Sequence, residues 1–205
     1  MGFHGRPPLF LTRHIFYRKC MRRFSIALAL VAVCVLATPS ARAGQDDPRL
    51  KDLFGELKDA TSSLEARVIE TKIWKIWIEN GDPQVDALMD RGMDAMSIDD
   101  TDTALAAFNE VVKLDDKFAE GFNKRATVEF MQHDYDASVA DIKRTLELEP
   151  RHFGALAGLG EVYLAMHDKA AALKAFEAAL AIDPKLEHVQ EAVDELKQQL
   201  EGNPT

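Results

Sequence analysis

Apolar residues recur three or four positions apart over most of the chain after residue 47, and this spacing predicts amphipathic helices. In the segment 62–79 such residues fall on two sides of one helix, so we expect that helix to need a packing neighbour on each side. In 185–200 they form a single stripe between charged residues. No segment after residue 47 alternates apolar and polar residues for long enough to predict a strand. The pattern therefore predicts an all-α fold.

A second regularity is an internal repeat. Three consecutive segments, 85–116, 119–150 and 153–184, have closing residues that are 34 positions apart. In the third segment the small residues Gly160 and Ala172 fall where two antiparallel helices of a hairpin would approach closely. Polar residues lie midway through each segment, where such a hairpin must reverse. Each segment is therefore predicted to form one helical hairpin.

The third segment also carries a motif. It reads Leu156-x2-Leu159-Gly160-x2-Tyr163, followed by Ala172-x3-Phe176, Ala179 and a closing Pro184. This motif resembles the pattern of the tetratricopeptide repeat (TPR) family, in which each repeat is a 34-residue helical hairpin. The resemblance covers 85–184, and it implies a right-handed superhelical solenoid of stacked hairpins.

The resemblance also suggests how the flanking segments are used. We expect 44–84 to form an N-terminal helical pair, with its longer helix between the short first helix and the first repeat. The segment 185–205 is similar to the helix and tail that close such arrays. One departure concerns the middle repeat, where Arg125 and Glu129 stand in place of the usual leucine and tyrosine.

The resemblance further implies a binding surface, because the first helices of stacked hairpins line the concave side of such solenoids. The three methionines of the first repeat suit an adaptable apolar groove for a peptide. The alternative is that neighbouring helices, including the N-terminal pair, bury them. Some family members bind the C-terminal carboxylate of a partner on this surface through Lys, Arg and Asn side chains. In this sequence the basic pair Lys124-Arg125 has only Asn123 beside it, which argues against this mode of binding. The predicted groove residues are Met89, Met93, Met96, Glu120, Asn123, Thr127, Phe130, Glu161 and Leu164.

The first 43 residues differ from the rest, with seven Lys/Arg and no Asp/Glu. The apolar run 24–37 would rise roughly 21 Å as a helix, short of the ~30 Å hydrocarbon core of a bilayer. Arg22 and Arg23 precede it, and Ala41-Arg42-Ala43 follows. This arrangement resembles a bacterial secretory signal peptide, cleaved after Ala43. The expectation is a periplasmic or secreted protein with no membrane insertion after cleavage.

Two alternatives concern this front segment. The run could remain uncleaved as an inner-membrane anchor. Residues 1–20 make the basic region before the apolar run much longer than a signal peptide requires, so translation could begin at Met21 rather than Met1. Under either start, 1–43 is treated as a leader that lies outside the fold.

The net charge and the positions of the cysteines argue against several classes of partner and of reactive site. The residues after the leader hold 18 basic and 34 acidic groups, a net charge of −16, which argues against nucleic acid and anionic lipid surfaces as partners. Both cysteines, Cys20 and Cys34, lie in the leader. The remaining sequence therefore has no thiol for a disulfide, a zinc site or a nucleophile.

Searches for catalytic and metal-binding patterns lead to no site. Of the four histidines after the leader, His133 and His167 occupy the same hairpin-turn slot, and neither His152 nor His188 lies at metal-ligand spacing. We expect no enzyme activity and no cofactor. The predicted function is an exported adaptor or assembly factor that binds a peptide or protein partner in the concave groove. The alternative is a structural or accessory subunit of a cell-envelope complex, held through its N-terminal helices or convex face.

Overall fold

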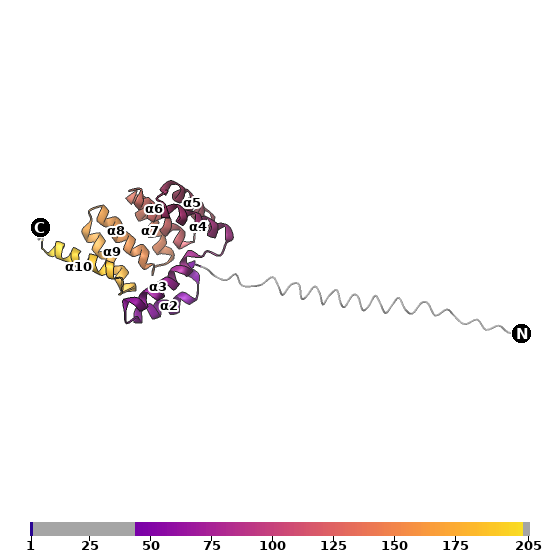
Figure 1. Ribbon diagram of the computed structural model, residues 1–205, viewed down its shortest axis with the longest axis horizontal. Helices are drawn as coiled ribbons and strands as arrows, with labels where there is room; N and C mark the ends of the chain where they lie inside the picture. The colour runs from indigo at the N-terminus through magenta and orange to yellow at the C-terminus, as the bar shows by residue number, and fades with distance from the viewer. Residues whose placement is uncertain (2–43, 203–205) are drawn as a thin grey trace. The chain divides into compact units, whose positions relative to one another are not determined.

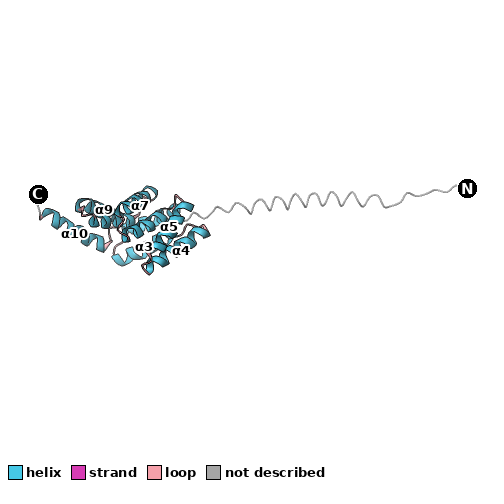
Figure 2. Ribbon diagram, turned by 90° about the horizontal axis from the view of Figure 1, so that it is seen from above, coloured by secondary structure: helices cyan, strands magenta, loops and turns pink. Residues whose placement is uncertain are grey.

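A computed structural model describes residue 1 and residues 44–202, and all regular structure in 44–202 is helical (Figures 1 and 2). The predicted all-α fold is confirmed. The leader predictions for 1–43 lie outside the described residues, apart from residue 1. Within the described part, no helix combines the length and apolar character needed to cross a bilayer. The elements are the 3-10 turn η1 (Gly44–Asp46) and the helices α2 (Arg49–Asp59), α3 (Ser63–Ile78), α4 (Pro83–Ser97), α5 (Thr101–Leu114), α6 (Ala119–Met131), α7 (Tyr135–Leu148), α8 (Phe153–Ala165), α9 (Lys169–Ile182) and α10 (Glu187–Glu201).

Three antiparallel hairpins, α4–α5, α6–α7 and α8–α9, stack in chain order (Figure 1). The second helix of each hairpin packs against the first helix of the next, so α5 contacts α6 and α7 contacts α8. After the last hairpin, α10 packs on α9 and buries Val189, Val193 and Leu196. This is the stacking expected of a helical solenoid, with its last apolar face covered by α10.

The hairpin turns repeat the same backbone device at 34-residue intervals. Asp99, His133 and His167 adopt left-handed conformations, with φ of 58°, 62° and 64°. The next residue in each turn is an aspartate whose side chain accepts a hydrogen bond from the N–H three residues later, as Asp134 does from Ala137. Each turn thereby ends one helix and caps the start of the following one.

The closest contact inside each hairpin pairs a small residue with a large one. A Cβ at Gly92 would lie only 2.5 Å from the Phe108 ring, and a Cβ at Gly160 would overlap the ring of Phe176. The middle repeat has Ala126 where the others have glycine, and its partner 16 residues later is the smaller Ile142. The sum of the two side chains is therefore similar in all three hairpins, which keeps their helices at close distance.

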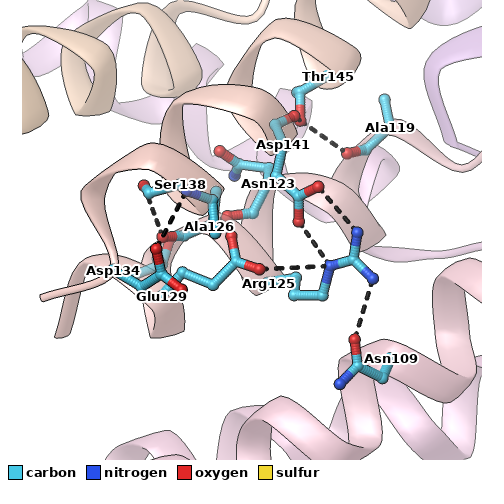
Figure 3. A network of polar contacts seen from close by, with 12 residues as sticks. Asn109, Ala119, Asn123, Arg125, Ala126, Glu129, Asp134, Ser138, Asp141 and Thr145 are labelled. Atoms are coloured by element: carbon cyan, nitrogen blue, oxygen red, sulfur yellow. Dashed lines mark hydrogen bonds and ion pairs between the residues drawn. The ribbon is translucent and has the colours of Figure 1, made fainter. Parts of the chain in front are cut away.

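The middle hairpin differs by a charge network that lies between its helices (Figure 3). The guanidinium of Arg125 donates to both carboxylate oxygens of Asp141, at 2.5 and 2.8 Å, and to Asn109 of the preceding hairpin at 3.0 Å. Glu129 lies 3.8 Å from the same guanidinium, and burial together with the Asp141 charge raises its pKa to about 7. Two buried hydroxyls, Ser138 Oγ and Thr145 Oγ1, donate to carbonyls of α6 and α7. Arg125 and Glu129, the departures from the repeat pattern, thus form an ion pair along α6, and Arg125 forms a second one with Asp141 across the hairpin.

The N-terminal hairpin α2–α3 lies beside the repeats rather than in line with them (Figure 1). Its buried leucines and isoleucines belong to the same core as Phe153, Phe176 and Leu186. The Trp77 ring stacks on His152 at 4.0 Å between centroids.

We expected α3 to lie between the first helix and the first repeat, and this position is wrong, because α3 packs against the third repeat instead. Trp74 and Trp77 pack against His152 and Phe153 at the start of α8, far along the chain. Among the described residues, the expected neighbour on the second apolar side is missing at Leu64 and Val68, which are exposed.

The N-terminal segment, η1 followed by the α2–α3 hairpin, contacts three successive joints between repeats. Phe118, His152 and Leu186 precede α6, α8 and α10, and they are 34 residues apart and all buried. Gly44 packs against the first of these residues and Trp77 against the second, while the third belongs to the core of α2 and α3. The first helices of the second and third repeats are thus partly covered along one side.

Candidate functional site

A cleft of about 420 Å³ lies between α6 and α8, the first helices of the second and third repeats. Helix α3 and the start of α10 form its walls. The volume falls in the ~300–1,000 Å³ range that is usual for ligand sites. Its lining residues are Glu70, Trp74, Asn123, Lys124, Ala126, Thr127, Phe130, Ser138, Ile142, Phe153, Gly154, Ala157, Gly158, Glu161, Val162, Leu186 and His188.

Small residues of α8 keep the cleft open. A Cβ at Gly154 would lie 2.5 Å from the Trp74 ring, so this glycine allows the indole to lie directly on the helix. A Cβ at Gly158, one helical turn later, would meet nothing within 4 Å. The space above Gly158 is therefore free for a side chain supplied by another molecule. Trp74 and Phe130, which are partly buried, line the same cleft and give it aromatic surface, and the buried Phe153 lies at its wall.

A buried polar cluster supports the wall formed by α6. The Glu120 carboxylate, 1% exposed, accepts from Asn123 Nδ2 at 3.0 Å and from His152 Nε2 at 2.9 Å, and Lys124 Nζ lies 3.1 Å away. Because His152 Nδ1 accepts from the Ala155 N–H, the neutral ring carries its proton on Nε2. Burial opposes ionisation of Glu120, but the Lys124 charge and the His152 hydrogen bond outweigh burial and hold its pKa below the usual range.

This cluster pairs internally with Lys124 and Asn123, two residues that could otherwise bind the carboxylate of a partner. Lys124 pairs with Glu120, and its ammonium also lies 5.3 Å from the centre of the Trp74 ring. Asn123 directs its amide N–H to the same glutamate. Since both donors already have an internal acceptor, a partner carboxylate would have to compete with Glu120 for them. The geometry agrees with the sequence-based argument against a carboxylate clamp.

The opposite end of the cleft is acidic. Glu70 on α3 lines the cleft and lies next to Asp183, which precedes α10 and is fully buried. Asp183 Oδ1 accepts from the Lys185 N–H at 2.9 Å, whereas its Oδ2 has no hydrogen-bond partner among the described residues. Burial, reinforced by the nearby Asp183 charge, raises the pKa of Glu70 to about 7. Near neutral pH a substantial fraction of Glu70 therefore remains protonated beside Asp183.

The structure brings together only part of the predicted groove. Asn123, Thr127, Phe130 and Glu161 all line the cleft, while Glu120 lies behind it. The remaining four are placed elsewhere. Met89 is 1% exposed in the core of the first hairpin, Met93 and Met96 pack partly buried against that core, and Leu164 packs against the large core of the third repeat. The methionines therefore fit the alternative of burial by neighbouring helices, because α4 packs against α5 and α6.

Sequence reasoning missed the contributions of α3 and α10, namely Glu70, Trp74, Leu186 and His188. One signal could have pointed to α3. Asp47-Pro48-Arg49 repeats the turn of Glu149-Pro150-Arg151 and Asp183-Pro184-Lys185, and in all three the acidic side chain accepts the N–H two residues later. This turn marks the start of a further helical hairpin ahead of the repeats. Its position beside them depends on contacts that the local pattern does not encode.

Metal chemistry finds no support in the described chain. Across residues 44–202, no three or more His, Cys, Asp or Glu side chains are grouped closely enough to hold a metal ion. The polar groups around the cleft are paired with one another, as Glu120 is with His152, or lie at its acidic end.

Comparison with known proteins places this arrangement in a family. A TPR repeat-containing protein of Rhizobium etli is 34% identical over 157 residues, which cover 77% of each chain. The sequence profile described as tetratricopeptide repeat matches residues 123–187.

Solved structures share the fold at lower identity. The TPR2B domain of yeast Sti1, in a complex with pHsp70, superposes with a TM-score of 0.54 at 20% identity, over 57% of this chain and 98% of that one. The first TPR of Spaghetti (RPAP3), bound to an HSP90 peptide, gives 0.55 at 17% identity, over 57% and 93%. MamA gives 0.55 at 22% identity, over 67% and 84%. From its relative and its stacked 34-residue hairpins, we conclude that the chain belongs to the tetratricopeptide repeat family.

Proposed function

We propose that this protein is an exported adaptor or assembly factor that binds a segment of a protein partner in the cleft between α6 and α8. The observation that carries the proposal is the open space above Gly158 in a cleft that Trp74, Phe130 and Phe153 also line. Aromatic surface next to a few polar groups is typical of sites that take up a side chain of a partner. The TPR domains of Sti1 and RPAP3 are each described in complex with a peptide or protein, which supports the same class of activity in this chain.

Filling the cleft tests this proposal. Gly158→Leu places a side chain in the open space, and Gly55→Leu on α2 is the matched control because a Cβ there also meets nothing within 4 Å. A photo-crosslinking residue at position 127, which is exposed and lines the cleft, reports occupancy in cells. We expect a discrete crosslinked partner with the parent and with Gly55→Leu, and its loss with Gly158→Leu. A partner that still crosslinks to Gly158→Leu would contradict cleft binding, provided that circular dichroism shows an intact helical fold.

Export is part of the proposal and rests on the leader sequence. If the leader is cleaved after Ala43, protein from a periplasmic extract begins at Gly44 when its N-terminus is sequenced. Full-length protein in the membrane fraction would instead support the inner-membrane anchor.

A second candidate function follows from the outer side of α3. Leu64 and Val68, one helical turn apart, are 75% and 53% exposed. An exposed apolar pair on the N-terminal hairpin fits the alternative of an accessory subunit held in an envelope complex. In that case Leu64→Glu with Val68→Glu removes the protein from the complex, as judged by native gel migration of solubilised envelopes, whereas Gly158→Leu does not.

A further inference from the structure

The charges that line the cleft are unbalanced, and the imbalance indicates what kind of partner it takes. Glu70 and Glu161 line it from α3 and α8, and the buried Asp183 lies behind Glu70. Among the described lining residues, Lys124 is the one lysine or arginine, and its ammonium is already 3.1 Å from Glu120. His188 is the remaining titratable lining group. The surface that a ligand would meet is therefore acidic as well as aromatic.

Once Glu70 is ionised, the acidic end lacks a donor for one buried atom, because the hydrogen bond between Glu70 and Asp183 requires the proton on Glu70. Asp183 is 0% exposed, and its Oδ2 has no hydrogen-bond partner among the residues described. A buried carboxylate oxygen without a donor is costly, and a neighbouring carboxylate adds repulsion. A cationic group placed beside Glu70 would relieve both costs.

We propose that the cleft recognises a partner segment in which a Lys or Arg side chain stands next to a bulky apolar one. The cation would lie at the Glu70–Asp183 end, and the apolar side chain would fill the space above Gly158 between Trp74 and Phe130. This inference rests on the proposed function and adds the chemistry of the partner. The net charge of −16 on the residues after the leader attracts such a segment and repels an acidic one.

Binding of a cation in the cleft is coupled to the release of a proton from Glu70. Glu70 shares its surroundings with Asp183, with Arg67 on its own helix and with the cleft residues Lys124, Glu161 and His188. With its pKa raised to about 7, Glu70 is largely protonated at pH 6, and the incoming cation favours release of that proton to solvent. If ionised Glu70 is required, affinity rises about tenfold between pH 6 and pH 8. Comparison with Glu70→Gln isolates the part of the pH dependence that is due to Glu70.

The test is a selection of phage-displayed random dodecapeptides on the full 205-residue chain. The parallel targets are Glu70→Gln/Glu161→Gln, which removes the cleft charges, and Glu56→Gln/Glu191→Gln, which removes two exposed carboxylates elsewhere. We expect peptides with Lys or Arg beside Trp, Phe, Leu or Ile to be enriched on the parent and on the second variant. Enrichment on the first variant should fall at least fivefold, and Gly158→Leu should abolish binding of the selected peptides.

The other outcomes separate this inference from the proposed function. If the selected peptides are acidic or neutral and Gly158→Leu still blocks them, the cleft binds peptides without cation recognition, and this inference is wrong. If Gly158→Leu blocks none of them, cleft binding itself is contradicted. For one enriched peptide, an affinity that is equal at pH 6 and pH 8 would contradict the role of Glu70 in holding the cation.

Discussion

At the scale of single residues, each hairpin depends on one pair of complementary sizes. Glycine faces phenylalanine in the first and third repeats, and Ala126 faces Ile142 in the second. The glycine allows the two helices of the hairpin to approach closely, because a Cβ at Gly160 would overlap the Phe176 ring. Its neighbour Gly158 has no such contact, so two glycines on one helix have different roles.

We expect Gly160→Ala to lower the free energy of unfolding by about 1–3 kcal/mol, because the added methyl group overpacks the contact with Phe176. Adding Phe176→Ile, which copies the second repeat, should recover part of this loss. Urea denaturation of the two single variants and the double variant measures the coupling. Gly158→Ala is the control, with a gain of roughly 0.5–1 kcal/mol from helix propensity alone. Equal effects of alanine at 158 and at 160 would contradict the distinction between the two glycines.

The left-handed residues of the turns provide a second prediction at this scale. Non-glycine residues are disfavoured at φ near +60°, so His167→Gly should stabilise the protein by about 0.5–1 kcal/mol. His133→Gly should gain less, because the Nδ1 of His133 lies 3.0 Å from the Tyr135 hydroxyl and the variant loses that hydrogen bond. Thermal unfolding of the two variants compares them directly. A larger gain at 133 than at 167 would show that the hydrogen bond to Tyr135 does not stabilise the turn.

At the scale of elements, the middle hairpin replaces apolar packing by ionic contacts. The repeat pattern marked Arg125 and Glu129 as departures, but the third member, Asp141, stands where the other repeats have Ala107 and Ala175. The three side chains form one unit (Figure 3). Exchanging any one of them alone leaves charges without partners.

Arg125→Leu should therefore destabilise the protein by about 2–3 kcal/mol at pH 8, a value reduced for the partial exposure of the guanidinium. The triple variant Arg125→Leu/Glu129→Tyr/Asp141→Ala imports the residues of the third repeat and should be as stable as the parent or more so. The loss in the single variant should shrink at pH 5, where Glu129 is protonated and one fewer charge is left without a partner. Chemical denaturation at both pH values measures these differences. A triple variant less stable than Arg125→Leu would contradict the idea of a self-contained unit.

The sequence predicts elements well and their long-range placement poorly, for a physical reason. The 34-residue period, the turns at His133 and His167 and the small–large pairs are local, so spacing along the chain reveals them. The contact between Trp77 and His152 joins residues 75 positions apart, and the residue types alone do not specify it. Four of the predicted groove residues line the cleft because they lie on the first helices of repeats. Its α3 wall depends on the long-range contact, so the pattern could not locate it.

At the scale of the whole molecule, stability depends on carboxyl groups shifted in opposite directions. Glu70 and Glu129 have pKa values raised to about 7, so they favour the folded state at low pH and lose that contribution as pH rises from about 4.5 through 7. Asp47, whose pKa is lowered chiefly by its hydrogen bonds with the Arg49 side chain, and Glu120 act oppositely and lose their contribution as pH falls. The two trends meet at mildly acidic pH.

We therefore expect the urea midpoint to be highest at about pH 4.5 and to fall towards pH 8. Glu70→Gln and Glu129→Gln should each flatten the fall, because the neutral amide does not ionise. Glu56→Gln is the control for net charge, since its side chain is exposed. A midpoint that rises steadily from pH 5 to pH 8 would contradict a stabilising role of protonated Glu70 and Glu129.

The N-terminal hairpin has a consequence for the number of repeats that this array can contain. Repeat arrays in which each unit touches only its neighbours can be lengthened or shortened by whole units. In this chain the η1 turn and the α2–α3 hairpin together meet the joints at Phe118, His152 and Leu186, which are one repeat apart. Duplicating or deleting a unit between these joints would carry one of them out of reach and expose apolar surface. The N-terminal segment thus fixes the number of repeats within this span. A protein with an additional unit there could not keep all three contacts.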